Sequence, residues 1–386
     1  MEVGKLLSNL LWWAYSSSIC TLKEEIASRV TYYYESLCRN IHRGKQKKDV
    51  SIDLNRVDDA IQRGVEWLES IQRKDGCIGG RLWEIWDTAN AVLALTSTGI
   101  ESDAIEPAVN FLLQSQLDNG GFFYECFPAS RDDIKDRRDL YCNETTPVAL
   151  MGIYKYEKKI TSEIRRGLDF LYEKQRECGG WELPYLGDPE IVDVKMNYFP
   201  SITGYALRAI LLIDDKPKKK VLEKALNFME KTQRKNGSWG RSFAFYNTES
   251  YAIRNMVSAL TSMKTLKWPK DMRTKIEKML NSAISYTKKM QNADGSWSAI
   301  SIASKAIATA LSLQTLLIAK GDRNSINLAV DWLLRNQEEK GFWKGGYYGH
   351  LHHPYLGYIN EVNNDVFATS EALVALSEYK KSQEIT

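Results

Sequence analysis

The stretch LDFLYEKQRECGGW, residues 168–181, shows the pattern that decides the fold. A helical run ends at Gln175, and a tight turn with two glycines and a tryptophan follows it. Five further segments end in a glutamine and a glycine-containing turn, with the glutamine at positions 72, 116, 233, 291 and 337. Self-similarity at a spacing of roughly 45–60 residues indicates one architecture that is built by stacking related units.

Each turn is followed by a second helical run of a different character. The second runs are apolar or small nearly all round, as in ANAVLAL (89–95) and IATALSL (307–313). The first runs instead carry charge on one face and an apolar stripe, such as Val65, Leu68 and Ile71. An amphipathic helix is half buried, whereas an apolar helix is buried on several sides. We therefore expect an all-α fold, an α6–α6 barrel of six helix–turn–helix units, with amphipathic helices outside.

We expect the barrel domain to cover residues 51–386 and an N-terminal helical segment to cover residues 1–50. The repeated glutamines are interpreted as structural, because a side-chain amide can satisfy backbone groups left unpaired at helix ends. The aromatic residues of the turns are interpreted as apolar filler between neighbouring units.

Composition excludes some classes of function. Lys and Arg number 52 against 49 Asp and Glu, and a net charge of +3 gives no reason to expect nucleic acid. The six cysteines show no C-x-x-C spacing and no signal peptide is recognised, which favours reduced thiols and a cytoplasmic location. The four histidines form no zinc-like arrangement with cysteine, so we expect no bound zinc. The sequence does not indicate an oligomeric state.

The N-terminal segment has two interpretations. It contains the apolar run GKLLSNLLWWAYSSS (4–18) and the basic run HRGKQKK (42–48). One interpretation is a leading helix packed on the barrel, and the other is peripheral contact with a membrane surface. No apolar run reaches the roughly 18–20 residues that span a bilayer.

The barrel architecture indicates where function would be located. All inner helices begin at one mouth of the barrel, and several of the connections that lead to them are long. These connections are rich in Tyr, Phe and Trp, and they cover residues 120–143, 179–200, 237–248 and 341–366. We expect the first residues of the inner helices to line a central cavity with aromatic walls.

The Q-x-x-x-G-x-W turns resemble the QW repeats of squalene–hopene and oxidosqualene cyclases, the class II terpene cyclases. Three further stretches resemble that family in the same order: WDTANAVLAL (86–95), GSWGRSFAFYNTESYAI (237–253) and HHPYLGY (352–358). The resemblance covers roughly residues 55–380, and it matches one catalytic barrel without the family's second barrel. Protein prenyltransferase β-subunits share the barrel, but the histidine that their zinc site needs is lacking from the middle of this chain.

The resemblance implies a site for acid-initiated cyclisation. In this family the proton donor is the central aspartate of D-x-D-D-T-A, at the start of an inner helix. Counted from Asp87, that motif falls on YCNETT (141–146) and puts Asn143 at the donor position. Because an amide cannot protonate an alkene, we expect Glu144 to be the acid and Asn143 to hold it by a hydrogen bond. The family's D-V-T-A-H falls on SITGY (201–205), so Tyr205 replaces the histidine that supports the acid.

The carboxylates also have structural interpretations. Glu144 in a first helical turn can stabilise the helix dipole and cap amides. Asp87 is a candidate for catalytic support or for a hydrogen bond to its neighbours, and Glu249 and Asp365 hold corresponding positions in later units. Burial in apolar surroundings raises a carboxyl pKa by up to about 3–5 units, which would supply the protonated acid.

Aromatic residues are candidates for substrate binding, because an aromatic face stabilises a cation by roughly 0.5–2 kcal/mol. Simple packing is the alternative for each of them. The candidates are Trp86, Tyr141, Tyr205, Phe243, Phe245, Tyr246, Tyr355 and Tyr358.

A literal D-D-x-x-D occurs in RDDIKD (131–136), with Asp132, Asp133 and Asp136. Such carboxylates can hold Mg²⁺ against a diphosphate, because this ion prefers carboxylate and phosphate oxygens. The flanking basic residues favour a solvated loop instead, which could steer an anionic head group to the mouth. We therefore expect no cofactor unless these aspartates bind Mg²⁺ with a diphosphate.

The sequence predicts a non-standard terpenoid cyclase, which converts a linear isoprenoid or prenylated compound into a cyclic product in an aromatic-lined cavity. Two other functions stay open at this point. One is a non-catalytic isoprenoid-binding protein, and the other is a Mg²⁺-dependent terpene synthase that ionises a diphosphate. The expected partner is an isoprenoid small molecule in each case.

Overall fold

Twelve helices form the framework of the described part of the chain in the computed structural model. The structure describes residues 50–80, 83–123, 141–182, 200–239, 248–299, 304–348, 351–353, 357–359 and 362–384. The predicted N-terminal segment, residues 1–50, lies outside this description except for Val50, so its helical nature stays a prediction. Among the described helices, none is both long and apolar enough to cross a membrane.

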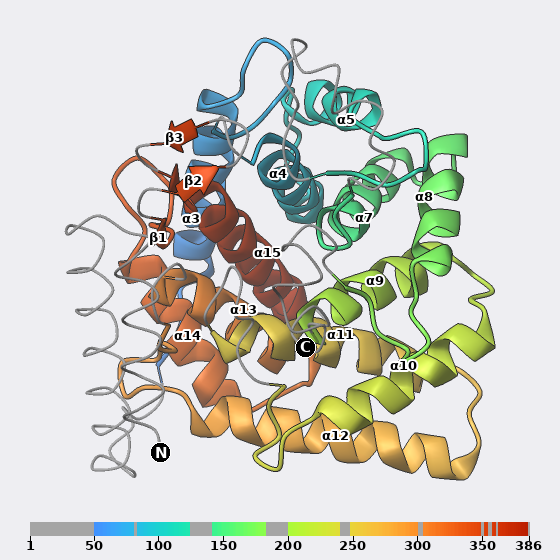
Figure 1. Cartoon of the computed structure of the whole chain (residues 1–386). Helices are drawn as coiled ribbons and strands as arrows, with labels where there is room; N and C mark the ends of the chain where they lie inside the picture. The colour runs from blue at the N-terminus through green and yellow to red at the C-terminus, as the bar shows by residue number, and fades with distance from the viewer. Residues whose placement is uncertain are drawn as a thin grey trace.

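Six helices form the inner ring of the barrel (Figure 1). They are α4 (Glu84–Thr98), α7 (Thr145–Glu157), α9 (Pro200–Ile213), α11 (Glu249–Lys264), α13 (Lys305–Ile318) and α15 (Asp365–Glu384). Successive inner helices contact each other, and α15 contacts α4, so the inner ring is closed.

The outer ring alternates with the inner ring along the chain (Figure 1). Its helices are α3 (Leu54–Ser70), α5 (Ile105–Gln114), α8 (Ser162–Glu173), α10 (Lys219–Thr232), α12 (Lys270–Lys289) and α14 (Arg323–Arg335). Each of them packs on at least one inner helix. The predicted all-α, α6–α6 barrel of six helix–turn–helix units is confirmed.

Burial follows the difference in character between the two sets of helices. Every residue of α13 from Ala306 to Leu316 is buried, although this run includes threonine, serine and glutamine. Outer helix α8 instead buries a stripe that contains Ile164, Leu168 and Leu171. A helix that is apolar on all sides needs neighbours on all sides, which only the inner ring provides.

The residues that the structure describes between α14 and α15 include four short strands. They are β1 (Tyr347–Tyr348), β2 (Leu351–His353), β3 (Gly357–Ile359) and β4 (Val362–Asn363). β1 pairs with β4 and β2 pairs with β3, both in antiparallel register. These strands belong to the connection between α14 and α15 and leave the helical framework unchanged.

The repeated glutamines join one unit to the next. Gln175 donates from Nε2 to Gly179 O at 3.1 Å and to Val221 O of α10 at 2.9 Å. Gln337 donates in the same way to Gly341 O at 2.7 Å and to Ala60 O of α3 at 2.8 Å. The other four glutamines repeat both bonds. The last unit is therefore attached to the first by the same bonds that join units within the chain.

The turn glycines are required by close backbone packing. Gly179 has a φ of +92°, and a Cβ atom at this position would lie 2.1 Å from Lys224 O of α10. The turn tryptophans are held as well, since Trp343 Nε1 donates to Leu333 O at 2.9 Å. Glutamine, glycine and tryptophan thus have the structural roles that the sequence indicated.

We expect Gln337→Ala to lower the free energy of unfolding by about 2–4 kcal/mol, because it removes three partly buried hydrogen bonds. Two of them are donated to the carbonyls of Ala60 and Gly341, which are left unpaired, and one is accepted from Arg63. Chemical denaturation of the variant and the wild type measures this difference. The control is Gln62→Ala, which removes an exposed side-chain bond to Glu66 and should change stability by no more than about 0.5 kcal/mol. Equal effects of the two substitutions would contradict a special role for the bond between the last and first units.

Candidate active site

A buried threonine marks the same position in five of the six inner helices. Ile78 N donates to Thr88 Oγ1 at 3.0 Å, and Phe122 N donates to Thr146 Oγ1 at 2.9 Å. Both donors stand six residues after a repeat glutamine. The remaining examples are Thr203, Thr309 and Thr369.

This hydrogen bonding fixes the register between the first and second units. Thr146, and not Thr145, occupies the position of Thr88. Glu144 therefore corresponds to Trp86, one residue away from the register that counting from Asp87 gave. Sequence alone could not detect the shift, because Thr145 and Thr146 are adjacent and either one completes the pattern.

Glu144 lies at the start of α7, inside the barrel. Only 5% of its surface is exposed, and its side chain makes no capping hydrogen bond to the helix. Its Oε1 atom accepts a hydrogen bond from the Tyr251 hydroxyl of α11. Burial raises the pKa of the Glu144 carboxyl to about 7, and the Tyr251 hydrogen bond opposes this rise. The carboxyl is thus substantially protonated near neutral pH. A carboxyl that only capped the helix would not need to be protonated.

The ring of Tyr251 belongs to a group of four packed aromatic side chains, which we call the aromatic cluster: Trp86, Tyr205, Tyr251 and Phe367. The rings of Tyr205 and Tyr251 have centroids 5.6 Å apart, and those of Tyr251 and Phe367 are 6.1 Å apart. Trp86 contacts Phe367 at 5.5 Å and Tyr205 at 6.1 Å. Four inner helices, α4, α9, α11 and α15, each contribute one ring.

The aromatic cluster contains two residues that the sequence indicated and two that it did not. Trp86 and Tyr205 were expected at the cavity. Tyr251 and Phe367 were missed, although both stand two residues after carboxylates, Glu249 and Asp365, that mark inner-helix starts. That offset was the available signal for them.

Tyr141 lies against the outer ring. Its ring makes an edge contact with Phe170 of α8 at 5.1 Å, and Lys174 Nζ lies 4.4 Å from its centroid. These contacts tie the connection before α7 to α8, which favours packing over substrate binding for this residue.

Asn143 does not hold Glu144 in the way that the sequence suggested. It is fully buried, and its Nδ2 donates to Glu182 O in the third unit at 2.7 Å. The amide therefore links two neighbouring turns, and the role of hydrogen-bond partner to Glu144 belongs to Tyr251.

Asp87 lies against Gly79, in the glycine-containing turn of the first unit. Burial raises the pKa of its carboxyl well above the usual range, opposed by a hydrogen bond from the Gly80 backbone and assisted by the nearby carboxylates of Asp365 and Glu84. Asp365 accepts from Gly345 N at 2.7 Å. Both aspartates thus bind backbone amides of the connections at the mouth, which favours the structural interpretation.

A buried polar network links neighbouring inner helices. Arg254 of α11 has 1% of its surface exposed, and its Nη2 lies 3.2 Å from Glu371 Oε2 of α15. Gln314 of α13 accepts from Arg254 Nε at 2.7 Å and donates to Glu371 Oε2 at 2.7 Å. Arg254 Nη1 and Arg208 Nη1 of α9 both donate to Asn255 Oδ1. The network joins four inner helices, and sequence patterns gave no sign of it.

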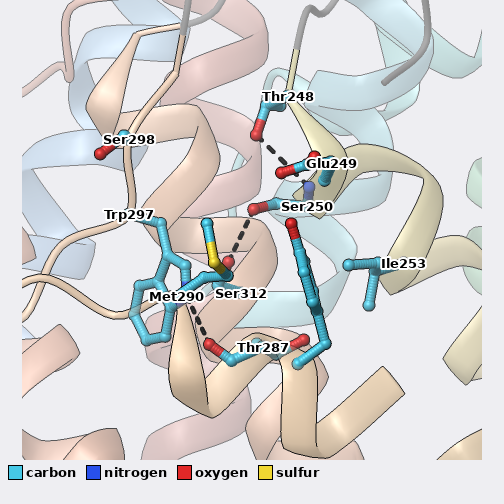
Figure 2. Close-up of a pocket in the computed structure, with 10 residues that line it drawn as sticks. Thr248, Glu249, Ser250, Ile253, Thr287, Met290, Trp297, Ser298 and Ser312 are labelled. Carbon is cyan, nitrogen blue, oxygen red and sulfur yellow. Dashed lines mark hydrogen bonds between the residues drawn. The ribbon is translucent and has the colours of Figure 1, made fainter. Parts of the chain in front are cut away.

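A small cavity of about 20 Å³ lies between α11, α12 and α13, and Figure 2 shows its lining. Glu249, Ser250, Ser298 and Ser312 supply polar groups, and the Ser250 and Ser312 hydroxyls are 2.8 Å apart. This volume suits about one water molecule. The pocket that holds Glu249 is therefore far too small for an isoprenoid.

Several candidate residues lie outside the described residues, and their roles stay predictions. They are Asp132, Asp133, Asp136, Phe243, Phe245, Tyr246 and Tyr355. Tyr358 lies in β3 opposite His352, and the structure does not describe its side chain. Within the described part of the chain, no group of three or more His, Cys, Asp or Glu residues could hold a metal ion.

Comparison with known proteins agrees with this architecture. The family model for the squalene–hopene cyclase C-terminal domain matches residues 50–199 and 188–381. The squalene–hopene cyclase of Zymomonas mobilis is 27% identical over 349 residues, covering 78% of this chain and 50% of that protein. Enfumafungin synthase of Hormonema carpetanum is 23% identical over 347 residues, covering 75% and 25%. The chain thus spans half of the first relative's length and a quarter of the second's.

Solved structures share the fold at low sequence identity. The type II terpene cyclase MstE from Scytonema superposes with a TM-score of 0.62 and 14% identity, covering 85% of this chain and 99% of that one. A protein from Actinoplanes gives a TM-score of 0.62 with 18% identity, covering 84% and 99%.

The closed α–α barrel gives this chain the fold that type II terpene cyclases have. The chain belongs to the squalene–hopene cyclase family.

The protonation of Glu144 should appear in the stability of the protein. The unfolded carboxyl loses its proton near its reference pKa of 4.5, whereas the folded one keeps it until about pH 7. The unfolded state therefore binds fewer protons in this window, and stability falls as the pH rises through it. We expect Glu144 to contribute a loss of about 3 kcal/mol between pH 4.5 and 7.

Urea denaturation of the wild type and Glu144→Gln across this pH range tests the expectation. The stability difference between them should vary with pH, while the exposed control Glu101→Gln should show no such dependence. A difference between wild type and Glu144→Gln that is constant from pH 4.5 to 7 would mean that the carboxyl ionises normally.

Proposed function

We propose that this protein cyclises a linear isoprenoid or prenylated compound by carbocation chemistry, with Glu144 as the proton donor. The observation that carries the proposal is a buried carboxyl at an inner-helix start, hydrogen-bonded to Tyr251 and placed beside the aromatic cluster. Membership of the squalene–hopene cyclase family supports it.

The chemistry demands an acid of this kind. An alkene is a very weak base, so the donor has to be protonated, aimed and shielded from water. Burial supplies the protonated form of Glu144, since its pKa of about 7 keeps about half of the carboxyls neutral at that pH. A solvent-exposed glutamate would be ionised there and could not donate.

The register of the second unit supports Glu144 over Asn143. In the family motif D-x-D-D-T-A, the donor aspartate stands two residues before the threonine. With Thr146 in the position of Thr88, the residue two before the threonine is Glu144. Asn143 then falls on the variable position, in agreement with its bond to the Glu182 carbonyl.

The aromatic cluster supports a cationic intermediate. Each ring face that a cation meets contributes roughly 0.5–2 kcal/mol. Tyr205 and Phe367 pack against Tyr251, whose hydroxyl contacts the acid, and Trp86 packs against both of them. A cation formed next to Glu144 would thus be created beside π faces. One solved structure of MstE is a complex with geranylgeranyl dihydroxybenzoate, which supports a prenylated substrate for the related fold.

Peripheral membrane contact through residues 1–50 and a cytoplasmic location belong to the same proposal. A substrate with a long prenyl chain resides in membranes, and the Trp12–Trp13 pair with the basic run at 42–48 would suit an anionic bilayer surface.

We expect Glu144→Gln to abolish product formation and to retain substrate binding, because the amide keeps the shape of the side chain without a transferable proton. Loss of a general acid typically costs about 10²–10⁴-fold in rate. The measurement is product formation from substrates with C15, C20 and longer prenyl chains, together with binding of the same compounds. The matched variant is Asp87→Asn, which changes another buried carboxyl at an inner-helix start and should retain turnover.

The remaining functions give different results in this experiment. Loss of turnover in Asp87→Asn alone would transfer the role to Asp87. Turnover that disappears on chelation of Mg²⁺ would favour the diphosphate-ionising synthase and the Asp132, Asp133 and Asp136 cluster. Tight binding by the wild type without any product would identify an isoprenoid-binding protein.

A further inference from the structure

The Glu144 carboxyl has a partner that the sequence did not indicate. We propose that Tyr251 is the positioning residue of this acid: its hydroxyl fixes which oxygen holds the transferable proton and stabilises the carboxylate that remains after transfer. This inference rests on the proposed function of Glu144.

The position of the Tyr251 hydroxyl is tightly defined. Tyr251 is fully buried, and its ring contacts Tyr205 of α9 and Phe367 of α15. Its own helix is α11, and its hydroxyl reaches Glu144 at the start of α7. With packing on two sides and a hydrogen bond at its tip, the side chain has little freedom to move away.

The hydrogen bond assigns the two carboxyl oxygens. A phenol donates most strongly to the carbonyl oxygen of a neutral carboxylic acid, because the hydroxyl oxygen is the poorer acceptor. Tyr251 donates to Oε1, so the acidic hydrogen belongs on Oε2. Oε2 is then the atom that delivers the proton to the substrate.

The same bond favours the products of proton transfer. When the Oε2–H bond breaks and the alkene π pair forms a C–H bond, Glu144 is left as a carboxylate and the substrate as a carbocation. Tyr251 keeps its own proton, and its hydrogen bond becomes charge-assisted and roughly twice as strong. An interaction that strengthens as charge develops lowers the barrier, whereas one that is constant does not.

No other described group competes for this role. Among the described residues, Tyr251 supplies the one side-chain hydrogen bond to the Glu144 carboxyl. The titratable groups near it are Cys142 before α7, Tyr205 on α9 and Tyr251 on α11. Burial raises the pKa of Cys142 to about 11 and that of Tyr205 above its usual value, so both stay neutral near pH 7. Neither of these two groups therefore titrates near pH 7 beside Glu144.

The test is Tyr251→Phe, which removes the hydroxyl and keeps the ring. Activity requires protonated Glu144, so the rate of the wild type should fall as the pH rises through about 7. Loss of the hydrogen bond should move this fall in rate to higher pH. It should also lower kcat by about 10–100-fold with little change in KM. The control is Tyr379→Phe, which removes another buried hydroxyl, bonded to Asn327 at the other end of an inner helix. Tyr379→Phe should leave the pH at which the rate falls unchanged.

Tyr205→Phe tests the residue that the sequence favoured as the helper. The proposal would be overturned if the pH at which the rate falls changed in Tyr205→Phe and stayed the same in Tyr251→Phe. Should Tyr251→Phe fail to fold, 3-fluorotyrosine at position 251 keeps ring and hydroxyl. Its more acidic phenol is a stronger hydrogen-bond donor, so the fall in rate should occur at lower pH than in the wild type. A fall at the same pH would refute the inference.

A second readout separates this inference from the proposed function. The carboxylic acid band of Glu144 can be identified in infrared spectra as the signal that Glu144→Gln removes, and it can be titrated without substrate. Its disappearance should occur at higher pH in Tyr251→Phe than in the wild type. An identical titration in both proteins would exclude the positioning role, whereas absence of turnover with every substrate would reject the proposed function alone.

Discussion

The structure depends on one repeated interaction, in which a glutamine amide donates to a carbonyl of its own turn and to a carbonyl of the next unit. Each such bond contributes only about 0.5–1.5 kcal/mol net. Its geometric effect is larger, because it fixes the separation of neighbouring units at every joint, including Gln337 to Ala60. The inner helices consequently start at one level, and only for that reason can residues of α7 and α11 meet across the barrel.

At the inner-helix starts, two opposing effects determine the pKa of the Glu144 carboxyl. Burial disfavours the charged form of Glu144 and raises its pKa, while the Tyr251 hydrogen bond favours the charged form and lowers it. Burial has the greater effect, so the carboxyl holds its proton near pH 7, while the hydrogen bond fixes its position. A group in water would meet neither condition. The aromatic cluster contributes to the second of these effects, since Tyr205 and Phe367 pack against the ring of Tyr251 and hold it in place.

The sequence was sufficient for the fold because the fold is periodic. Helical character, glutamine and glycine recur six times, and each repetition reduces the ambiguity of the others. The site is different, because it is assembled from single residues on separate units. Trp86, Tyr205 and Glu144 could be selected as residues at inner-helix starts. The pairing of Glu144 with Tyr251, 107 positions apart, depends on how α7 and α11 are rotated, which no local pattern contains. The one-residue shift between Thr145 and Thr146 had the same origin.

The polar network of Arg254, Gln314 and Glu371 has a consequence for how the inner helices can move relative to one another. Burying an ion pair is a poor way to gain stability, since desolvation offsets most of the attraction. The network does join α11, α13 and α15 by groups that are buried and hydrogen-bonded to each other. If one of these helices slid past its neighbours, buried polar groups would lose their partners, which is costly. This side of the inner ring is therefore resistant to shear.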